Sequence, residues 1–305
     1  MRLALAVALA LGSAVLARAS QDTPPFRAAT RLVVLQATVR NARGQPVTDL
    51  DRSAFSVYEN GTRQSIDVFR REDVPVSIGL LIDNSGSMRT RRATVEAAAL
   101  AFARASNPMD ELFVVNFADK VQLDVPFTSD RAALERGITR ADAVGGTALW
   151  DAVASAQTYL RGGTRPRRVL VVITDGNDNA SEATRSKVVR NAQQQDTVID
   201  AVGLFGTGAK EARGRRELDE LARATGGTAL YPMADDQINA TMLDLAREIR
   251  NQYLIAYTPL NARLDGTYRT IRVTASRRAN ERLTVLTRPG YRAAAAGTGS
   301  QGINE

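Results

Sequence analysis

The first pattern along the chain is an alternation of apolar and polar residues between positions 31 and 69. Alternation with a period of two predicts strands with one buried face. The Asn60-Gly61 dipeptide lies between two such runs and predicts a tight hairpin turn. Charged residues between Arg70 and Val74, followed by Pro75, interrupt the pattern. The positions that share the first predicted face are Val33, Leu35, Ala37 and Val39.

From Val76 to about Asn251, short apolar runs alternate with amphipathic stretches of helical period. This alternation is typical of a parallel sheet with crossover helices, so we expect an α/β domain with a doubly wound, mostly parallel sheet. The predicted strands cover residues 76–82, 112–117, 169–174, 198–204 and 228–231. The predicted helices cover residues 90–105, 131–141, 149–160, 181–194, 215–225 and 235–251.

Strand patterns return after Gln252, over residues 253–258, 268–275 and 283–287. A lone hairpin is marginally stable in water. We therefore expect these strands to pair with residues 31–69 as one small all-β unit.

The two ends of the chain differ from the rest in composition. Met1 and Arg2 precede an apolar run that ends in Ala17-Arg18-Ala19, which predicts a secretory signal peptide cleaved after Ala19. We expect a secreted or periplasmic protein without a membrane span after cleavage. The expected division is a signal peptide (1–19), an N-terminal β segment (20–73), an α/β domain (74–251), a C-terminal β segment (252–292) and a disordered tail (293–305).

Composition limits the chemistry that the chain supports. It has no Cys and no His, so any metal must be held by oxygen ligands, which favours hard cations. The formal net charge is +7, but the arginines are scattered and no aromatic residues are interleaved with them. This favours a solvated surface over a specific nucleic-acid site. A polyanion-binding structural scaffold remains an alternative.

Three loops carry hydroxyl and carboxylate side chains at the places where parallel strands end or helices begin. Residues 83–87 follow the first α/β strand, residues 145–147 open a predicted helix, and residues 174–176 close another apolar strand. Ligands of open α/β sheets bind at this edge. The loops can supply five oxygen ligands to magnesium or manganese: Asp83, Ser85, Ser87, Thr147 and Asp175. With two carboxylates, the cation would keep positive charge and an exchangeable water.

The ordered motifs Asp-x-Ser-x-Ser, Gly-Gly-Thr and Thr-Asp-Gly resemble the metal-ion-dependent adhesion site (MIDAS) of von Willebrand factor A domains. The likeness covers residues 75–250, and the flanking β segments resemble those of exported bacterial relatives. It implies a Rossmann-like fold in which Ser85, Ser87 and Thr147 hold Mg²⁺ by their hydroxyls. Asp83 and Asp175 would act directly or through water. The resemblance also implies a protein partner that presents a carboxylate to the metal, and a last helix that shifts when it does.

A metal-dependent phosphoryl-transfer hydrolase is the alternative enzyme class, with Asp83 as its nucleophile. Such phosphatases usually carry a second carboxylate where this chain has Ser85. A serine nucleophile would need an activating base, and the chain has no histidine to serve as one. We therefore predict no catalytic residues and a binding module that is not an enzyme.

Overall fold

The computed structural model describes residues 32–71, 73–139, 144–176, 178–206, 208–277 and 282–293. The predicted signal peptide, residues 1–19, lies outside the described residues, as does the predicted tail beyond Ala293. In the part of the chain that is described, no helix is long and apolar enough to cross a membrane.

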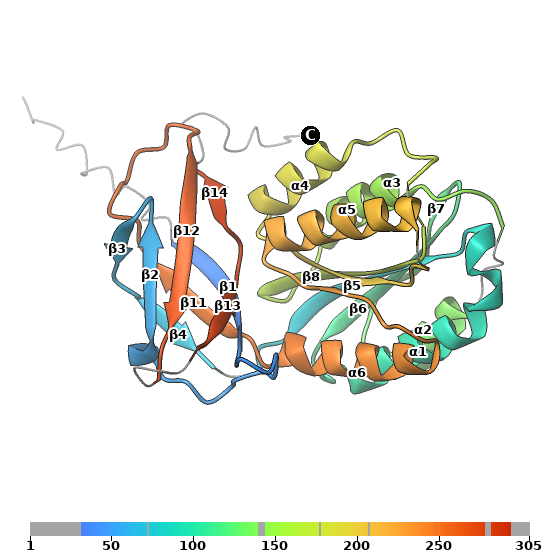
Figure 1. The fold of residues 1–305 in the computed structure, drawn as a ribbon, viewed down its shortest axis with the longest axis horizontal. Helices are drawn as coiled ribbons and strands as arrows, with labels where there is room; N and C mark the ends of the chain where they lie inside the picture. Colours follow the sequence, from blue (N-terminus) through green and yellow to red (C-terminus); the bar gives the residue numbers. More distant parts are fainter. Residues whose placement is uncertain are drawn as a thin grey trace, which may run out of the picture. The chain divides into compact units, whose positions relative to one another are not determined.

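A six-stranded sheet in the order β10-β9-β8-β5-β6-β7 forms the centre of the α/β domain (Figure 1). All its neighbouring strands are parallel except the pair β6 and β7. All eight residues of β5 are buried, as its continuous apolar run predicts. The strands are β5 Val76–Asp83, β6 Glu111–Phe117, β7 Val121–Thr128, β8 Arg167–Thr174, β9 Val198–Gly203 and β10 Ala229–Leu230.

Strand β7 is missing from the predicted set of strands. It lies at the edge of the sheet, antiparallel to β6, and its register is irregular. Gln122 and Leu123 are both exposed and only Val125 is buried, so the segment lacks the apolar run of a central strand. An edge strand needs one neighbour and little burial, and periodicity therefore signals it weakly.

Helices cover both faces of this sheet. Buried residues of α1, α2 and α6 pack on one face, and those of α3, α4 and α5 pack on the other (Figure 1). The predicted apolar face of the last helix is confirmed, since Ile238, Met242, Leu245 and Ile249 are all buried. The helices are α1 Arg92–Ala105, α2 Arg131–Ile138, α3 Leu149–Leu160, α4 Arg185–Gln194, α5 Ala209–Thr225 and α6 Asp236–Arg250, with a short 3₁₀ turn η2 over Gly86–Thr90.

Two helix starts differ by more than two residues from those expected. Helix α4 begins at Arg185 instead of residue 181, because the Thr184 side chain caps it by accepting a hydrogen bond from the Lys187 amide. Helix α5 begins at Ala209, six residues before the expected start. Its end is as expected, since Gly226 adopts the left-handed conformation (φ 85°) of a helix C-cap.

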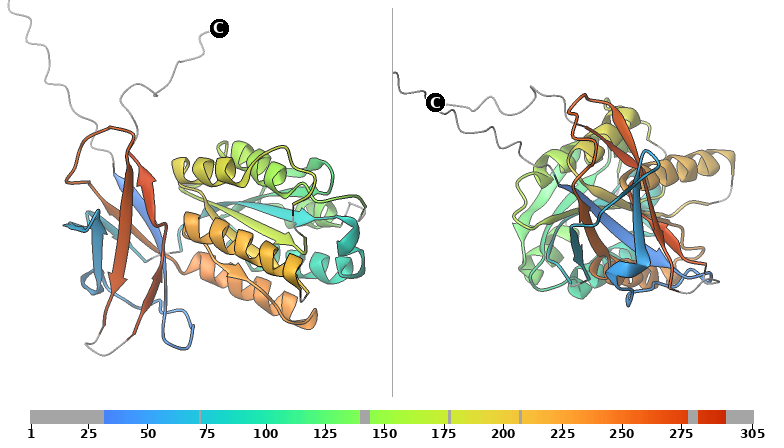
Figure 2. Two further views of the ribbon diagram at one scale, coloured as in Figure 1. Left: turned by 45° about the horizontal axis from the view of Figure 1, so that its top comes forward. Right: turned by 90° about the vertical axis from the view of Figure 1, so that its left-hand side faces the viewer.

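The flanking segments form two four-stranded sheets, in the orders β13-β1-β11-β4 and β14-β12-β2-β3 (Figure 2). The predicted pairing of the two segments is confirmed: β1 pairs with β11, and β2 with β12. Asn60 and Gly61 both have positive φ, as a two-residue hairpin turn requires. The strands are β1 Val33–Arg40, β2 Phe55–Glu59, β3 Thr62–Gln64, β4 Val68–Arg70, β11 Tyr253–Tyr257, β12 Tyr268–Ala275, β13 Thr284–Leu286 and β14 Gly290–Arg292.

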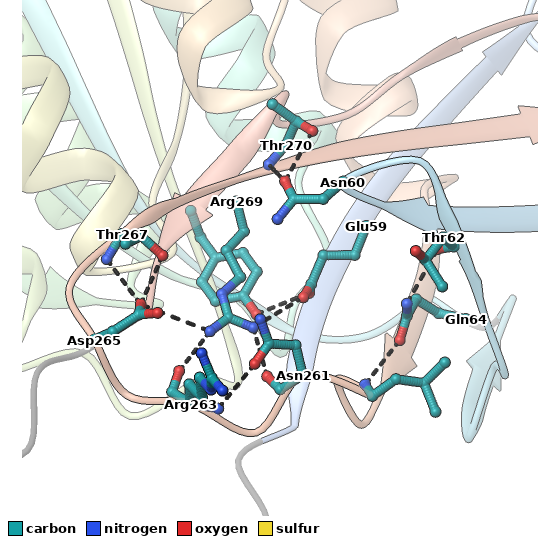
Figure 3. Close-up of polar contacts among 12 residues, drawn as sticks. Glu59, Asn60, Thr62, Gln64, Asn261, Arg263, Asp265, Thr267, Arg269 and Thr270 are labelled. Atoms are coloured by element: carbon teal, nitrogen blue, oxygen red, sulfur yellow. Dashed lines mark hydrogen bonds and ion pairs between the residues drawn. The ribbon is translucent and has the colours of Figure 1, made fainter.

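A buried ion pair fixes one loop of this β unit (Figure 3). The Arg269 side chain is 1% exposed, and its Nη1 lies 3.2 Å from Oε1 of Glu59. The hydroxyls of Tyr257 and Tyr291 donate to the other Glu59 oxygen. The Arg269 guanidinium also donates to the carbonyls of Asn261 and Arg263. A buried charge requires several hydrogen-bonding partners. Two of the partners of Arg269 are carbonyls of the β11–β12 connection, so these bonds hold the connection against the strands.

The β unit and the α/β domain also share polar contacts. Arg40 of β1 donates two hydrogen bonds to the Glu248 carboxylate of α6. Arg167, at the start of β8, donates to Gln36 of β1 and to Gln252. Helix α6 ends at Arg250 and β11 begins at Tyr253, so the two elements are directly joined.

Candidate metal site

The three loops predicted to carry ligands meet at the carboxyl edge of the parallel strands. Strands β5 and β8 are parallel neighbours, which places Asp83 beside Thr174 and Asp175. The amide of Gly86 donates to the Gly145 carbonyl at 3.0 Å, and the Val144 amide donates to the Asn84 carbonyl at 2.9 Å. These bonds tie the loop that precedes α3 to the loop that follows β5.

Hydrogen bonds link four of the five predicted ligands. Oδ1 of Asp83 accepts from the Ser85 amide at 2.8 Å, and the hydroxyls of Ser85 and Ser87 lie 3.1 Å apart. The Ser87 hydroxyl donates to Oδ1 of Asp175 at 2.7 Å. The fifth predicted ligand, Thr147, lies against Gly176, where an added β-carbon would be 3.2 Å from the Thr147 hydroxyl oxygen. The structure therefore brings all five side chains to one place.

Burial of the Asp83 carboxylate makes a nearby positive charge favourable at this site. Asp83 is 1% exposed, and burial raises its pKa to about 6 from an ordinary 3.8. Hydrogen bonds from Thr174 and Ser85 lower this pKa, whereas the nearby charge of Asp175 raises it. No lysine or arginine is among the groups with the largest effects on this pKa. A cation at this position would stabilise the ionised carboxylate.

The donor set fits a hard divalent cation. All five side chains offer oxygen, in two carboxylates and three hydroxyls. Within the described residues, no group of three or more His, Cys, Asp or Glu side chains is arranged to hold a metal. Hydroxyl ligands would therefore have to complete any coordination shell here.

Several residues that position the loops were not predicted from the sequence. Oδ1 of Asp119 accepts from the Gly146 amide at 2.6 Å, and Oδ1 of Asn179 accepts from the Thr147 amide at 2.8 Å. The Thr174 hydroxyl donates to Oδ2 of Asp83 at 2.6 Å. No local pattern marks Asp119 or Asn179, because both side chains act on loops that are distant in sequence.

The approach of Asp119 explains the Gly-Gly pair of the second loop. Gly145 has a φ of 94°, which is strained for any residue with a β-carbon. A β-carbon on Gly145 would lie 2.2 Å from the Asp119 carboxylate, and one on Gly146 would lie 2.7 Å from it. The pair therefore lets the carboxylate reach the backbone before Thr147.

Residues 78–177 match the family model of the von Willebrand factor type A domain. Among solved structures, a von Willebrand factor type A protein from Catenulispora acidiphila is 13% identical with a TM-score of 0.52, and the match covers 90% of this chain and 76% of that chain. Proximal thread matrix protein 1 from the mussel byssus is 18% identical with a TM-score of 0.53. That match covers 63% of this chain and 51% of the mussel protein, about half its length.

A second structure of the mussel protein is described as having a zinc-occupied MIDAS motif, with 18% identity, a TM-score of 0.52 and coverage of 63% and 50%. At these identities the likeness shows the fold. No curated protein matches the chain. Domains of this family bind a divalent metal at the MIDAS and are typically interaction modules. The family match, the mostly parallel sheet and the three ordered loops together identify residues 78–177 as part of a von Willebrand factor type A (VWA) domain.

Proposed function

We propose that this protein is a divalent-metal-dependent protein-binding module that grips a partner through a carboxylate. Ser85, Ser87 and Thr147 would hold Mg²⁺ or Mn²⁺ by their hydroxyls, while Asp83 and Asp175 would act directly or through water. The observation that carries the proposal is the set of five oxygen side chains, which includes the buried Asp83 with its raised pKa.

Charge balance explains why a partner carboxylate suits this site. Two carboxylates together with neutral hydroxyls leave a divalent cation short of strong anionic ligands. The exposure of Ser87 beside the buried Ser85 indicates that solvent reaches one side of the group. A carboxylate arriving from that side would complete the coordination shell and remain attached to the partner protein.

The same residues give little support to catalysis. Asp83 already accepts hydrogen bonds from Thr174 and from the Ser85 amide, and Ser85 stands where phosphatases usually carry a second carboxylate. No histidine is present in the chain to move protons. We therefore propose a role in adhesion or protein interaction instead of hydrolysis.

We further propose that the module acts outside the cytoplasm, as a secreted or periplasmic protein. Support for this location comes from the apolar run and the Ala17-Arg18-Ala19 cleavage pattern. Sequencing the N-terminus of the protein recovered from the extracellular or periplasmic fraction would test it. A mature protein that retains Met1 would contradict it.

Calorimetric titration tests the metal assignment. We expect the wild type to bind Mg²⁺ and Mn²⁺, and the Asp83→Ala, Ser85→Ala double variant to lose both. The Asp244→Ala variant is a matched control, because this carboxylate is 72% exposed on α6. Equal binding by the wild type and the double variant would refute the site.

A pull-down from the native extracellular or periplasmic fraction tests the binding function. We expect a partner to be retained in magnesium and released in EDTA, and the double variant to retain none. Retention that survives EDTA but weakens steeply with salt would favour the polyanion-binding scaffold instead. Metal-dependent turnover of phosphate or acyl esters that is lost in Asp83→Ala would favour the hydrolase.

A further inference from the structure

A second polar site lies at the opposite edge of the sheet, where β8 and β9 begin. A cavity of about 120 Å³ is lined there by residues of both the α/β domain and the β unit. The α/β side includes Arg167, Arg168 and Thr197, and the β unit contributes Val34, Leu254 and Arg288. Helix α4 also contacts strand β14, and both elements are labelled in Figure 1. None of the predicted metal ligands lines this cavity.

The lining is positively charged. Three arginines line the cavity, and Asp196 is the only acidic residue among the lining residues, so positive charge is in excess. Asp196 pairs with Arg288, but its side chain is 56% exposed. Burial lowers the pKa of Arg167 to about 10, so this guanidinium is still a cation at neutral pH. Asp110 and Asp200 offset part of its charge.

Arg168 differs from Arg167 and Arg288, the other two arginines of the cavity, because no carboxylate balances its charge. Within the described chain, its side chain forms no hydrogen bond or ion pair, and its Nε is buried. The buried Nε of Arg288 also has no partner, although its Nη2 donates to the Val34 carbonyl at 2.8 Å. The Thr197 residue is 2% exposed, and its hydroxyl is unpaired as well.

These unpaired groups indicate what kind of ligand would fit. Guanidinium N–H groups only donate, so each requires an acceptor, and the Thr197 hydroxyl can donate to the same group. An unpaired buried donor is unfavourable, and arginine pairs most strongly with oxyanions. At ~30 Å³ per water molecule, the cavity volume corresponds to about four waters, which suits a small ion.

We propose that this cavity binds a small tetrahedral oxyanion of the phosphate or sulfate class. Arg168, the Nε of Arg288 and the Thr197 hydroxyl would donate to its oxygens. Because residues of both the α/β domain and the β unit line the cavity, the bound ion would also stabilise the contact between them.

Titration with inorganic phosphate and sulfate tests the proposal. The measurements use the full chain in EDTA at constant ionic strength, so that the metal site and Mg²⁺–phosphate complexes do not contribute. We expect saturable binding by calorimetry and a rise in Tm with either anion relative to chloride. Arg168→Gln should weaken binding about tenfold, as expected for one charge-assisted hydrogen bond.

Two further variants keep the test decisive. Thr197→Val removes only the hydroxyl at nearly constant volume and should also weaken binding, while circular dichroism checks that each variant folds. Arg131→Gln, at an exposed position on α2, should bind as the wild type does. The proposal is overturned by an absence of saturable binding, by equal affinity in Arg168→Gln and Arg131→Gln, or by binding of acetate without phosphate or sulfate.

Discussion

At the scale of single residues, Asp83 is unfavourable to bury in its ionised form, yet it lies where it can bind a metal ion. Its carboxyl is 1% exposed at the end of β5 and has a raised pKa of about 6. Ionisation at neutral pH therefore costs free energy in the metal-free fold. Functional sites commonly hold such groups, because the binding partner supplies the missing charge.

This conflict predicts that Asp83→Asn stabilises the metal-free protein. In the wild type, the stabilisation from the raised pKa is full below the unfolded value of 3.8 and is lost as pH rises through about 6. The shift corresponds to about 3 kcal/mol, at ~1.4 kcal/mol per pH unit. In EDTA, urea unfolding should show the variant gaining stability over the wild type between pH ~4 and ~7. A pH-independent difference would contradict the raised pKa.

The same pKa predicts that protons compete with the metal. Magnesium affinity should be constant above pH ~7 and should fall below about 6, approaching tenfold per pH unit as Asp83 becomes protonated. Calorimetric titration across this range measures the effect. The measurement should be repeated in buffers with different ionisation heats, which reveals the protons released on binding. Affinity that stays constant down to pH ~5 would show that Asp83 does not hold the metal.

At the scale of elements, the loop before α3 depends on residues that contact it from elsewhere. The Asp119 carboxylate accepts a hydrogen bond from the Gly146 amide, and the Asn179 side-chain oxygen accepts one from the Thr147 amide. The three motif loops could be found in the sequence because strand ends and helix starts carry local signals. The positions of Asp119 and Asn179 could not, since their partners lie 27 and 32 residues away.

Gly146→Ala should therefore weaken magnesium binding while leaving the fold intact. The added β-carbon would lie 2.7 Å from both the Asp119 and the Asn179 side-chain oxygens, so the side chains that hold the Gly146 and Thr147 amides must shift. A loss of about 10- to 100-fold is typical when groups that orient metal ligands are disturbed. Gly162→Ala is a suitable control, because its added β-carbon would lie 3.4 Å from the nearest atom. Equal magnesium affinities in the two variants would refute the positioning role.

At the scale of the whole molecule, the apolar strands and helices account for the fold without any metal. Two clusters of buried residues fill the two faces of the six-stranded sheet, and a third fills the β unit. The predicted ligands lie at the edge of the sheet, outside these clusters. Metal binding should therefore stabilise the fold without being required for it.

Chelation should lower the Tm without unfolding the protein. At a hundredfold excess over Kd, bound metal adds about 2.7 kcal/mol, or about 5–10 °C in a domain of this size. Differential scanning calorimetry with magnesium and with EDTA measures this shift. The Asp83→Ala, Ser85→Ala variant should show none. Global unfolding in EDTA at room temperature would mean that the metal, not the core, maintains the fold.

The sequence by itself determined the features that depend on neighbouring residues: the central strands, the helices, the Asn60-Gly61 hairpin and the motif loops. Period and turn chemistry are local properties of the chain. The tertiary structure alone decided the edge strand β7, the raised pKa of Asp83, the support from Asp119 and the arginine-lined cavity. Each of these depends on burial or on contacts between residues far apart in the chain, which a local pattern does not encode.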